Sequence, residues 1–333
     1  YIKNILSKVY KYHMKILAVQ NRMGIGDTVI FLPFIKALSE KFNSPISLLV
    51  KESSKADQYL YHTNYIDKIL LLERDKKINN RHDGFFGSLN LIKDLRKYNF
   101  DKIFIFNSSI RYNLIARFSK ITEIFQYPLL QKNKQHITET PKKFLKDKFN
   151  LIINQDPEIH INDELVKNSI KNFNIKNNEF NVLLGIGGSG PTKRIPAETF
   201  LALIEKISKV KKCRFFLATG KNYEEQIILK KILNSNFGDY CMPLDDLSIK
   251  ETLPIIKNCN ISICNDTGFG HLSAALGVKT ITLMADAPLI YGNYSSKMFP
   301  IIPDGVDMVN HGTKGKDKIN ANKIFEMVIQ IFN

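Results

Sequence analysis

The sequence lacks the features that mark several large classes of protein. It holds only four cysteines, and none of them forms a C-x-x-C pair; they are Cys213, Cys241, Cys259 and Cys264. This pattern argues against a disulfide framework or a zinc site, and it predicts buried, reduced thiols in a cytoplasmic protein. No run approaches the roughly 18–20 uninterrupted apolar residues of a membrane-spanning helix.

Common catalytic signatures are also missing. The chain has no H-E-x-x-H, no G-x-S-x-G and no Cys/His nucleophile arrangement. No Asp-x-Asp pair stands securely after an expected strand, which argues against the metal-dependent, single-domain glycosyltransferases. We therefore expect no metal. The glycine-rich segment 187–193 is not a P-loop, because Pro191 and Thr192 separate its last glycine from Lys193.

Positive charge is in excess. The chain has 48 Lys and Arg against 32 Asp and Glu, which gives a formal net charge of +16. Such a protein attracts anions. Many lysines are interleaved with asparagine and isoleucine, as in residues 76–81, and no basic segment carries aromatics spaced for base stacking. We therefore expect an anionic small molecule and an anionic membrane face as partners, and no nucleic acid.

Residues 1–13 form a short basic segment. Lysines interrupt its apolar residues and no cleavage site follows, so it does not have the pattern of a signal peptide. Two interpretations stay open. The segment is either an extension packed on the surface, or an amphipathic helix in peripheral contact with the inner face of the inner membrane.

Short β-branched runs alternate with longer helical patterns along the chain. Strands are expected at 15–20, 46–50, 68–72, 102–106, 123–126, 181–186, 214–218, 261–265 and 280–284. Helices are expected at 28–42, 88–98, 111–119, 141–152, 197–210, 224–233, 249–257, 268–276 and 320–332. This alternation predicts an α/β protein in which crossover helices join parallel strands.

The length suits two domains rather than one, since 333 residues exceed a small single core. The polar, proline-containing segment Asn154–Pro157 is the best candidate for the boundary between the two domains. It gives an N-terminal Rossmann-like domain, residues 1–155, and a C-terminal one, residues 156–333. We expect the two to face a central cleft, with ligands at the carboxyl ends of the strands.

Asp27 lies in the first of three polar loops that directly follow an expected strand. The loop reads Asn-Arg-Met-Gly-Ile-Gly-Asp-Thr over residues 21–28. Asp27 is a candidate N-cap of the helix expected from Thr28. A positioned carboxylate can also act as a general base. One residue could serve in both roles.

The second loop, residues 187–196, offers hydroxyl and cationic donors after the strand at 181–186. Ser189, Thr192, Lys193 and Arg194 could grip a diphosphate through O–H, ammonium and guanidinium groups. The alternative is a surface loop with two solvated cations.

The third loop opens the segment Asp-Thr-Gly-Phe-Gly-His-Leu-Ser-Ala-Ala-Leu-Gly, residues 266–277. Asp266, Thr267 and Gly268 stand at an expected helix N-terminus, where unpaired N–H groups and the helix dipole attract anions. His271 lies one turn into that helix and can add a donor. The alternative is a capped helix with an incidental histidine.

Together the three loops resemble glycosyltransferase family 9, which includes the lipopolysaccharide heptosyltransferases. The family pattern has a Gly-Asp pair after the first strand and a mid-chain lysine followed by a proline-containing helix start. Late in the chain it has Asp-(Thr/Ser)-Gly-x-x-His-x-x-Ala-Ala-Leu. All three appear here in that order, over roughly residues 15 to 330. The resemblance implies the GT-B architecture and an inverting, metal-independent transfer of heptose.

The resemblance also implies roles for individual residues. Asp27 would be the catalytic base in the acceptor-binding domain, within an acceptor loop that includes Arg22, Met23, Gly24 and Gly26. The nucleotide-sugar donor would be bound by Ser189, Thr192, Lys193, Glu224, Asp266, Thr267, Gly268 and His271. Glu224 would hold the ribose, with Glu225 as the alternative, although acidic residues in a first helical turn also simply favour the dipole.

No separate cofactor is implied, because the nucleotide-diphosphate sugar, ADP-linked by family analogy, is itself a substrate. The acceptor would be lipid-linked or an oligosaccharide. Ala285–Pro288 departs from the Gly-Pro-Thr loop that is common in the family, which leaves the sugar open. Two alternatives remain: a nucleotide-sugar epimerase of the same fold, and a non-catalytic nucleotide-sugar or glycan-binding protein.

Overall fold

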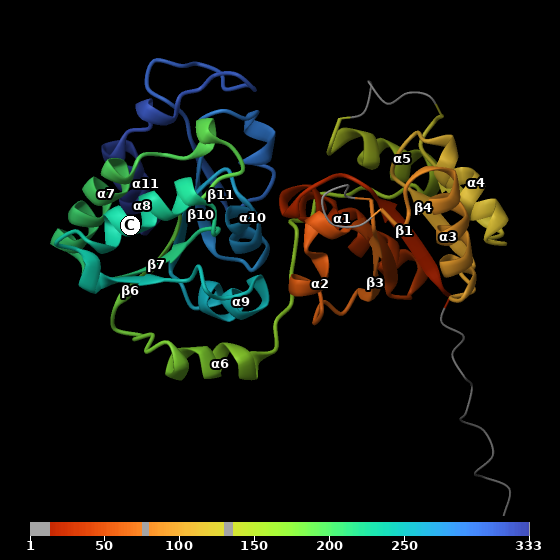
Figure 1. Cartoon of the computed structure of the whole chain (residues 1–333), viewed down its shortest axis with the longest axis horizontal. Helices are drawn as coiled ribbons and strands as arrows, with labels where there is room; N and C mark the ends of the chain where they lie inside the picture. Colours follow the sequence, from red (N-terminus) through yellow and green to blue (C-terminus); the bar gives the residue numbers. More distant parts are fainter. Residues whose placement is uncertain (1–13, 75–79, 130–135, 333) are drawn as a thin grey trace, which may run out of the picture. The chain divides into compact units, whose positions relative to one another are not determined.

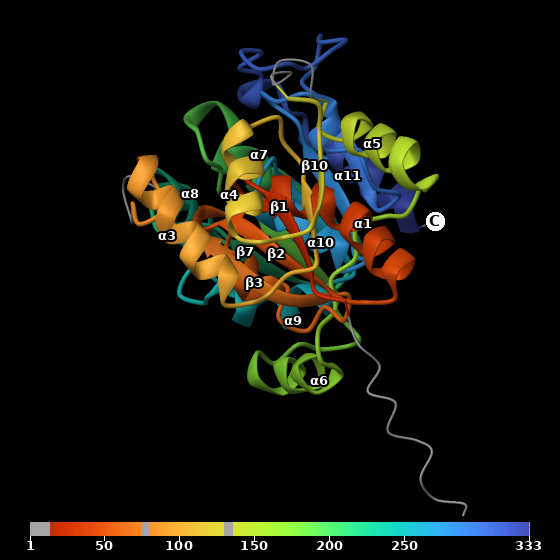
Figure 2. The ribbon, with the colours of Figure 1, turned by 90° about the vertical axis from the view of Figure 1, so that its right-hand side faces the viewer.

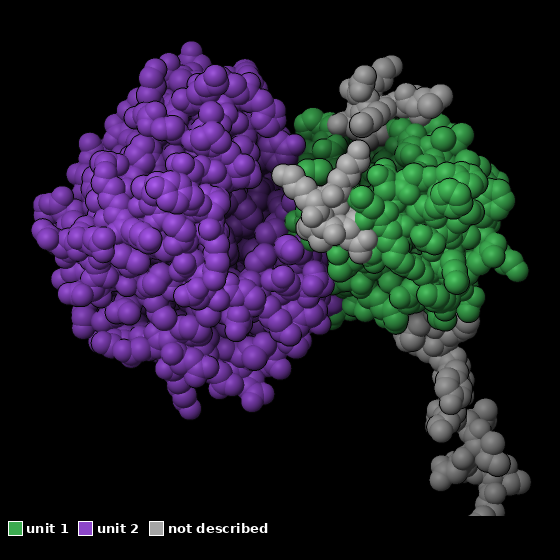
Figure 3. All heavy atoms as spheres, in the orientation of Figure 1, with its two compact units in different colours: residues 1–23, 33–54, 64–153 green, residues 24–32, 55–63, 154–333 purple. Residues whose placement is uncertain are grey.

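The structure is a computed structural model that describes residues 14–74, 80–129 and 136–332. The segment 1–13 and its two interpretations lie outside the described residues. The chain divides into two compact units (Figure 3). Unit 1 comprises the chain up to Met23, residues 33–54 and residues 64–153, and unit 2 comprises residues 24–32, 55–63 and 154–333. Two short segments of the first half therefore belong to unit 2.

Unit 1 is built on a parallel sheet with the strand order β3-β2-β1-β4-β5 among its described residues. Its strands are β1 (Ile16–Gln20), β2 (Ile46–Lys51), β3 (Ile66–Leu72), β4 (Lys102–Ile105) and β5 (Glu123–Gln126). Its helices are α3 (Gly84–Arg96), α4 (Ile110–Phe118), α5 (Glu139–Phe149) and the later turns of α1 (Ile25–Phe42). The strand order reverses between β1 and β4, where sheets of this kind bind ligands.

Unit 2 contains the second parallel sheet, in the order β11-β10-β9-β6-β7-β8 within the described chain. Its strands are β6 (Phe180–Gly185), β7 (Cys213–Ala218), β8 (Cys241–Pro243), β9 (Ile261–Asn265), β10 (Lys279–Leu283) and β11 (Met298–Ile301). Its helices are α2 (Ala56–Tyr59), α6 (Asp163–Asn172), α7 (Ala197–Val210), α8 (Tyr223–Leu233), α9 (Ile249–Lys257), α10 (Gly268–Ala275) and α11 (Ala321–Phe332). The order reverses between β6 and β9.

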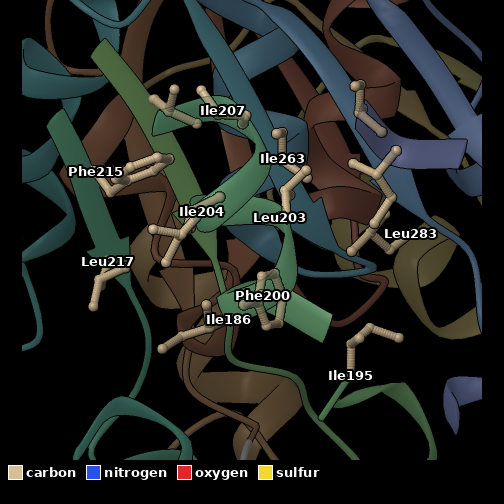
Figure 4. Close-up of a cluster of buried hydrophobic side chains, with 14 of the residues drawn as sticks. Ile186, Ile195, Phe200, Leu203, Ile204, Ile207, Phe215, Leu217, Ile263 and Leu283 are labelled. Carbon is tan, nitrogen blue, oxygen red and sulfur yellow. The ribbon is translucent and has the colours of Figure 1, made fainter. Parts of the chain in front are cut away.

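Each sheet is covered by helices on its faces (Figures 1 and 2). In unit 2, α7 packs beside α8 and α11, while α9 packs beside α10 and α6. The central strands are buried on both faces and read as apolar runs, as parallel sheets require. The core on the α7 face gathers Phe200, Leu203 and Ile204 against Phe215 and Ile263 (Figure 4). Within the described residues, none of the helices combines the length and the apolar character that a membrane span requires.

The expected α/β architecture is confirmed, and most expected elements match within a few residues. The pattern missed α6, whose N-cap Asn162 accepts a hydrogen bond from the Glu164 N–H. It also missed β8 and β11, which form the two edges of the unit 2 sheet. Both strands contain a proline, Pro243 and Pro300. Proline cannot donate to a ladder, so it weakens the sequence pattern and is confined to edge strands.

Candidate functional site

The candidate site lies at the switch point of the unit 2 sheet, where the loops after β6 and β9 are neighbours. Asn265, the last residue of β9, is fully buried and joins the two loops. Its Nδ2 donates to the carbonyl oxygens of Ile186 and Gly187, both at 2.9 Å. This side chain therefore fixes the start of the glycine-rich loop beside the Asp266 segment.

Lys193 and Asp266 form an ion pair between those loops. Lys193 ends the short 3-10 helix Pro191–Lys193, and its Nζ lies 2.5 Å from Asp266 Oδ2. The Asp266 side chain is only 8% exposed, whereas that of Lys193 is 24% exposed. The ammonium group is thus held near the N-terminus of α10, where the helix dipole also favours an anion.

His271, one turn into α10, is a buried and neutral imidazole. Burial lowers its pKa to about 4, against the opposing effect of the Asp266 carboxylate and with a smaller lowering by Lys193. Its Nε2 lies 3.9 Å from Asp266 Oδ1. At neutral pH the ring therefore carries one N–H, and its other nitrogen must accept.

Tyr294 determines which ring nitrogen of His271 accepts a hydrogen bond. Its hydroxyl lies 2.6 Å from His271 Nδ1, and the two rings stack with centroids 5.6 Å apart. Burial, with a contribution from Asp266, raises the pKa of Tyr294 well above its usual value, so the hydroxyl keeps its proton. If this proton is donated to Nδ1, the ring proton stays on Nε2, on the Asp266 side.

The N-termini of α1 and α10 meet within unit 2. A Cβ on Gly26 would overlap the imidazole of His271, and a Cβ on Gly268 would lie 2.7 Å from Cδ1 of Ile25. At Gly26 any larger residue would displace the buried imidazole, whereas at Gly268 the Ile25 side chain would have to shift. Two of the expected loops, those of Asp27 and Asp266, are therefore brought together here.

Asp27 is the third residue of α1 and is partly exposed. The helix begins at Ile25, three residues earlier than expected, after Gly24 with φ +98°. The interpretation of Asp27 as the N-cap is therefore wrong. Its carboxylate lies in the first turn, where a negative charge still favours the helix dipole.

The remaining acceptor-loop residues, Arg22 and Met23, belong to unit 1. The Arg22 N–H donates to Gln20 Oε1 at 3.1 Å, and the Met23 side chain is 64% exposed. Because the division between the units falls after Met23, the expected acceptor loop is split between them.

Thr192 faces a segment that the family pattern did not predict. Its hydroxyl bonds to Asp286, whose Oδ1 also accepts the Lys314 N–H at 2.8 Å. These hydrogen bonds, that of Thr192 first, lower the pKa of Asp286 below its usual value. The departing segment Ala285–Pro288 thus supports the loop of Lys193, while Ser189 is exposed on that loop.

Of the two glutamates at the start of α8, Glu225 contacts the glycine-rich loop. It is buried, and its Oε1 accepts the Gly188 N–H at 2.6 Å. A Cβ on Gly187 would lie 2.7 Å from the same oxygen. Glu224 is exposed. The structure thus brings Glu225 to the loop, whereas Glu224, the preferred ribose residue, lies on the exposed side of the helix.

Sequence reasoning missed three residues of the site: Asn265, Asp286 and Tyr294. Asn265 had a local signal, since a polar residue ending a buried strand lies at the ligand edge of the sheet. Asp286 likewise follows the strand β10. Tyr294 had none, because it contacts His271 from 23 residues away in the sequence.

No group of three or more His, Cys, Asp or Glu side chains within the described ranges is arranged to hold a metal ion.

The family model "Glycosyltransferase family 9 (heptosyltransferase)" matches residues 88–302. "Lipopolysaccharide heptosyltransferase 1" of Campylobacter coli is 25% identical over 358 residues, which cover 95% of this chain and 98% of that protein.

Two solved structures share the fold. A family 9 glycosyl transferase from Veillonella parvula superposes with a TM-score of 0.77 at 16% identity, covering 96% of this chain and 97% of that one. The E. coli heptosyltransferase WaaC with ADP superposes with a TM-score of 0.69 at 14% identity, covering 95% and 99%. The two parallel-sheet units thus correspond to the GT-B architecture of these proteins.

Proposed function

Because this chain belongs to glycosyltransferase family 9, the heptosyltransferases, we propose that it transfers heptose from ADP-heptose to a lipopolysaccharide-core or related glycan acceptor. The observation that carries the proposal is the cluster of Lys193, Asp266 and His271 at the switch point of the unit 2 sheet. A cation, a helix N-terminus and a neutral imidazole converge there, which suits a diphosphate.

The proposed reaction gives each of these groups a role. An acceptor hydroxyl attacks the anomeric carbon of the heptose while Asp27 takes up its proton, and the bond to the diphosphate breaks. This direct displacement inverts the anomeric centre. Lys193 and the N-terminus of α10 stabilise the charge that develops on the departing ADP. The role proposed for Asp27 is supported by its neighbour Gly26, which contacts His271 of the donor cluster.

Transfer can be tested with ADP-heptose and a heptose-deficient lipopolysaccharide core, by following ADP release and the mass of the glycan. We expect ADP and extended acceptor in equal amounts. Donor that changes configuration without acceptor would identify an epimerase instead. Donor that binds without any turnover would identify a non-catalytic binding protein.

Transfer should not need a divalent metal ion, because the proposed mechanism takes its positive charge from Lys193 and the helix dipole. We expect enzyme that was treated with chelator and assayed in excess EDTA to have the same initial rate as untreated enzyme. Loss of activity in EDTA that magnesium or manganese restores would contradict this mechanism.

Tyr294→Phe should weaken donor binding through His271. Removing the hydroxyl releases Nδ1 and allows the other tautomer, so that Nε2 no longer carries the ring proton in every molecule. We expect the Kd for ADP to rise by about 5–10-fold, which corresponds to the free energy of one neutral hydrogen bond. Since the pKa of His271 is about 4, this effect should be the same at pH 6 and pH 8.

The readout that separates positioning from folding is the tautomer itself, measured from the ring ¹⁵N shifts of His271 in both proteins. An unchanged tautomer together with an unchanged Kd would exclude the role of Tyr294. Tyr240→Phe, at an exposed tyrosine elsewhere in unit 2, is the matched control.

A cytoplasmic site of action is part of the proposal. The four cysteines are free and buried, as expected for a reducing compartment.

A further inference from the structure

Unit 1 exposes large apolar side chains on two neighbouring helices. Of the fourteen large hydrophobic residues that are exposed in the described parts of the chain, six lie on α3 and α4. They are Phe85, Phe86, Leu89, Ile110, Leu114 and Phe118, which we name the α3–α4 patch. Phe85 and Phe86 are 74% and 79% exposed. Scattered apolar residues need no explanation, but a cluster of this kind marks an interaction surface.

The six side chains form one surface because the helices are fixed side by side (Figures 1 and 2). Arg111 Nε donates to Ser88 Oγ at 2.9 Å near the start of both helices. Arg96 donates to the Phe118 carbonyl at 2.7 Å near their ends. On α4 the apolar positions Ile110, Leu114 and Phe118 recur every four residues. On α3, Phe85 and Phe86 stand four and three residues before Leu89, so on each helix the apolar side chains share a face.

Exposed cations lie at the C-terminal ends of the two helices that carry this patch. Those without an acidic partner among the ion pairs of the described residues are Lys93, Arg96, Arg117 and Lys120. The acidic groups nearby are neutralised: Asp94 pairs with Arg81 at 2.5 Å and Lys97 at 3.0 Å, and Asp83 pairs with Arg74 at 3.0 Å. The patch therefore combines apolar side chains with uncompensated positive charge, which matches the surface of an anionic lipid layer.

The position of the patch fits the same partner. α3 and α4 begin at the carboxyl edge of the unit 1 sheet, the edge where such sheets bind ligands. Phe85, Phe86 and Ile110 lie at that end of the helices. A lipid layer that contacts them would hold a lipid-linked acceptor next to that edge. A second copy of the chain fits less well, because a two-fold interface would bring the exposed cations of both copies, which have the same charge, into one interface.

We propose that the α3–α4 patch docks unit 1 onto an anionic lipid surface. The inference rests on the proposed function only in that a lipid-linked acceptor gives the docking a purpose. The aromatic side chains enter the headgroup layer, and the lysines and arginines remain at the level of the lipid phosphates.

The test is sedimentation of the full chain with vesicles of equal parts phosphatidylglycerol and phosphatidylcholine, and with phosphatidylcholine alone. We expect binding to the anionic vesicles and at least about tenfold less to the neutral ones. Phe85→Ser/Phe86→Ser should lower the partition coefficient by about tenfold or more, since each Phe loses its apolar burial. Lys93→Glu should lower it by several-fold.

The matched control is Tyr223→Ser/Ile227→Ser, at two exposed apolar residues of α8 in unit 2. It should bind vesicles like the unchanged chain, and residues 1–13 are present in every variant. Leu89→Ser/Leu114→Ser repeats the test at the middle of the patch. The proposal would be overturned if both patch variants bound the anionic vesicles as well as the unchanged chain does. A dimer in solution that the patch variants dissociate would also overturn it, since the patch would then bind a second copy.

Transfer assays separate this inference from the proposed function. The patch variants should keep the kcat/KM for a delipidated core oligosaccharide and lose it for acceptor embedded in anionic vesicles. Vesicle binding without any transfer would refute the proposed function and leave the docking surface standing. If the patch variants transfer to both acceptors as well as the unchanged chain does, the docking surface alone would be refuted.

Discussion

Asp27→Asn is expected to lower kcat by about 10²–10⁴-fold, the usual contribution of a positioned general base. The amide keeps the shape of the carboxylate but cannot take up the proton of the attacking hydroxyl. The Kd for ADP should stay nearly unchanged, since the diphosphate is assigned to Lys193 and the N-terminus of α10. Steady-state transfer and calorimetric titration with ADP, on the same preparation, measure both quantities.

The control for Asp27→Asn is a second first-turn carboxylate in unit 2. Asp57 lies in the first turn of α2 and is exposed, so Asp57→Asn removes a similar helix-dipole interaction without touching the loop. Each substitution should cost only about 0.3–1 kcal/mol of stability, visible as a small shift in Tm. A kcat that falls equally in both variants, or in neither, would remove Asp27 from the role of base.

Lys193→Ala is expected to raise the Kd for ADP by about 10–150-fold, which corresponds to the 1.5–3 kcal/mol of a charge-assisted hydrogen bond. The structure adds a second reason. Lys193 neutralises Asp266, whose side chain is only 8% exposed. Without the ammonium group, this carboxylate would repel the diphosphate at the same helix N-terminus.

That second reason is testable by itself. Lys193→Ala/Asp266→Asn should recover part of the lost ADP affinity relative to Lys193→Ala, because the repelling charge is gone. Lys231→Ala breaks an exposed ion pair with Glu198 on neighbouring helices of unit 2 and serves as the control. An unchanged Kd in Lys193→Ala would exclude this lysine from the donor site. A double variant weaker than the single one would show that Asp266 contributes directly to binding.

Local pattern was sufficient for much of this protein. Apolar runs of period two or 3.6 depend on near neighbours only, so β9, α7 and α9 have the bounds that their residues predict. The polar loops after β1, β6 and β9 could each be assigned to the carboxyl edge of their own sheet, because parallel strands end on the same side. Asp27, Lys193, Asp266 and His271 were therefore candidates before any fold was known.

Which of those residues meet is a matter of tertiary structure alone. The choice between Glu224 and Glu225 depends on which face of α8 packs under the glycine-rich loop, and two adjacent helical residues point about 100° apart. The contact of Gly26 with His271 joins residues 245 positions apart by the packing of two helix N-termini. No local periodicity encodes such a contact.

The sequence by itself determined that this is a parallel α/β protein with anion-binding loops at the carboxyl ends of its strands, since strand, helix and turn preferences are local. Only the tertiary structure decided that His271 is a neutral imidazole. Its pKa depends on burial, on the Asp266 carboxylate and on Lys193, which comes from a distant loop of the chain. Burial and charge proximity are properties of the packed chain, because they sum over neighbours that the fold alone brings within a few ångströms.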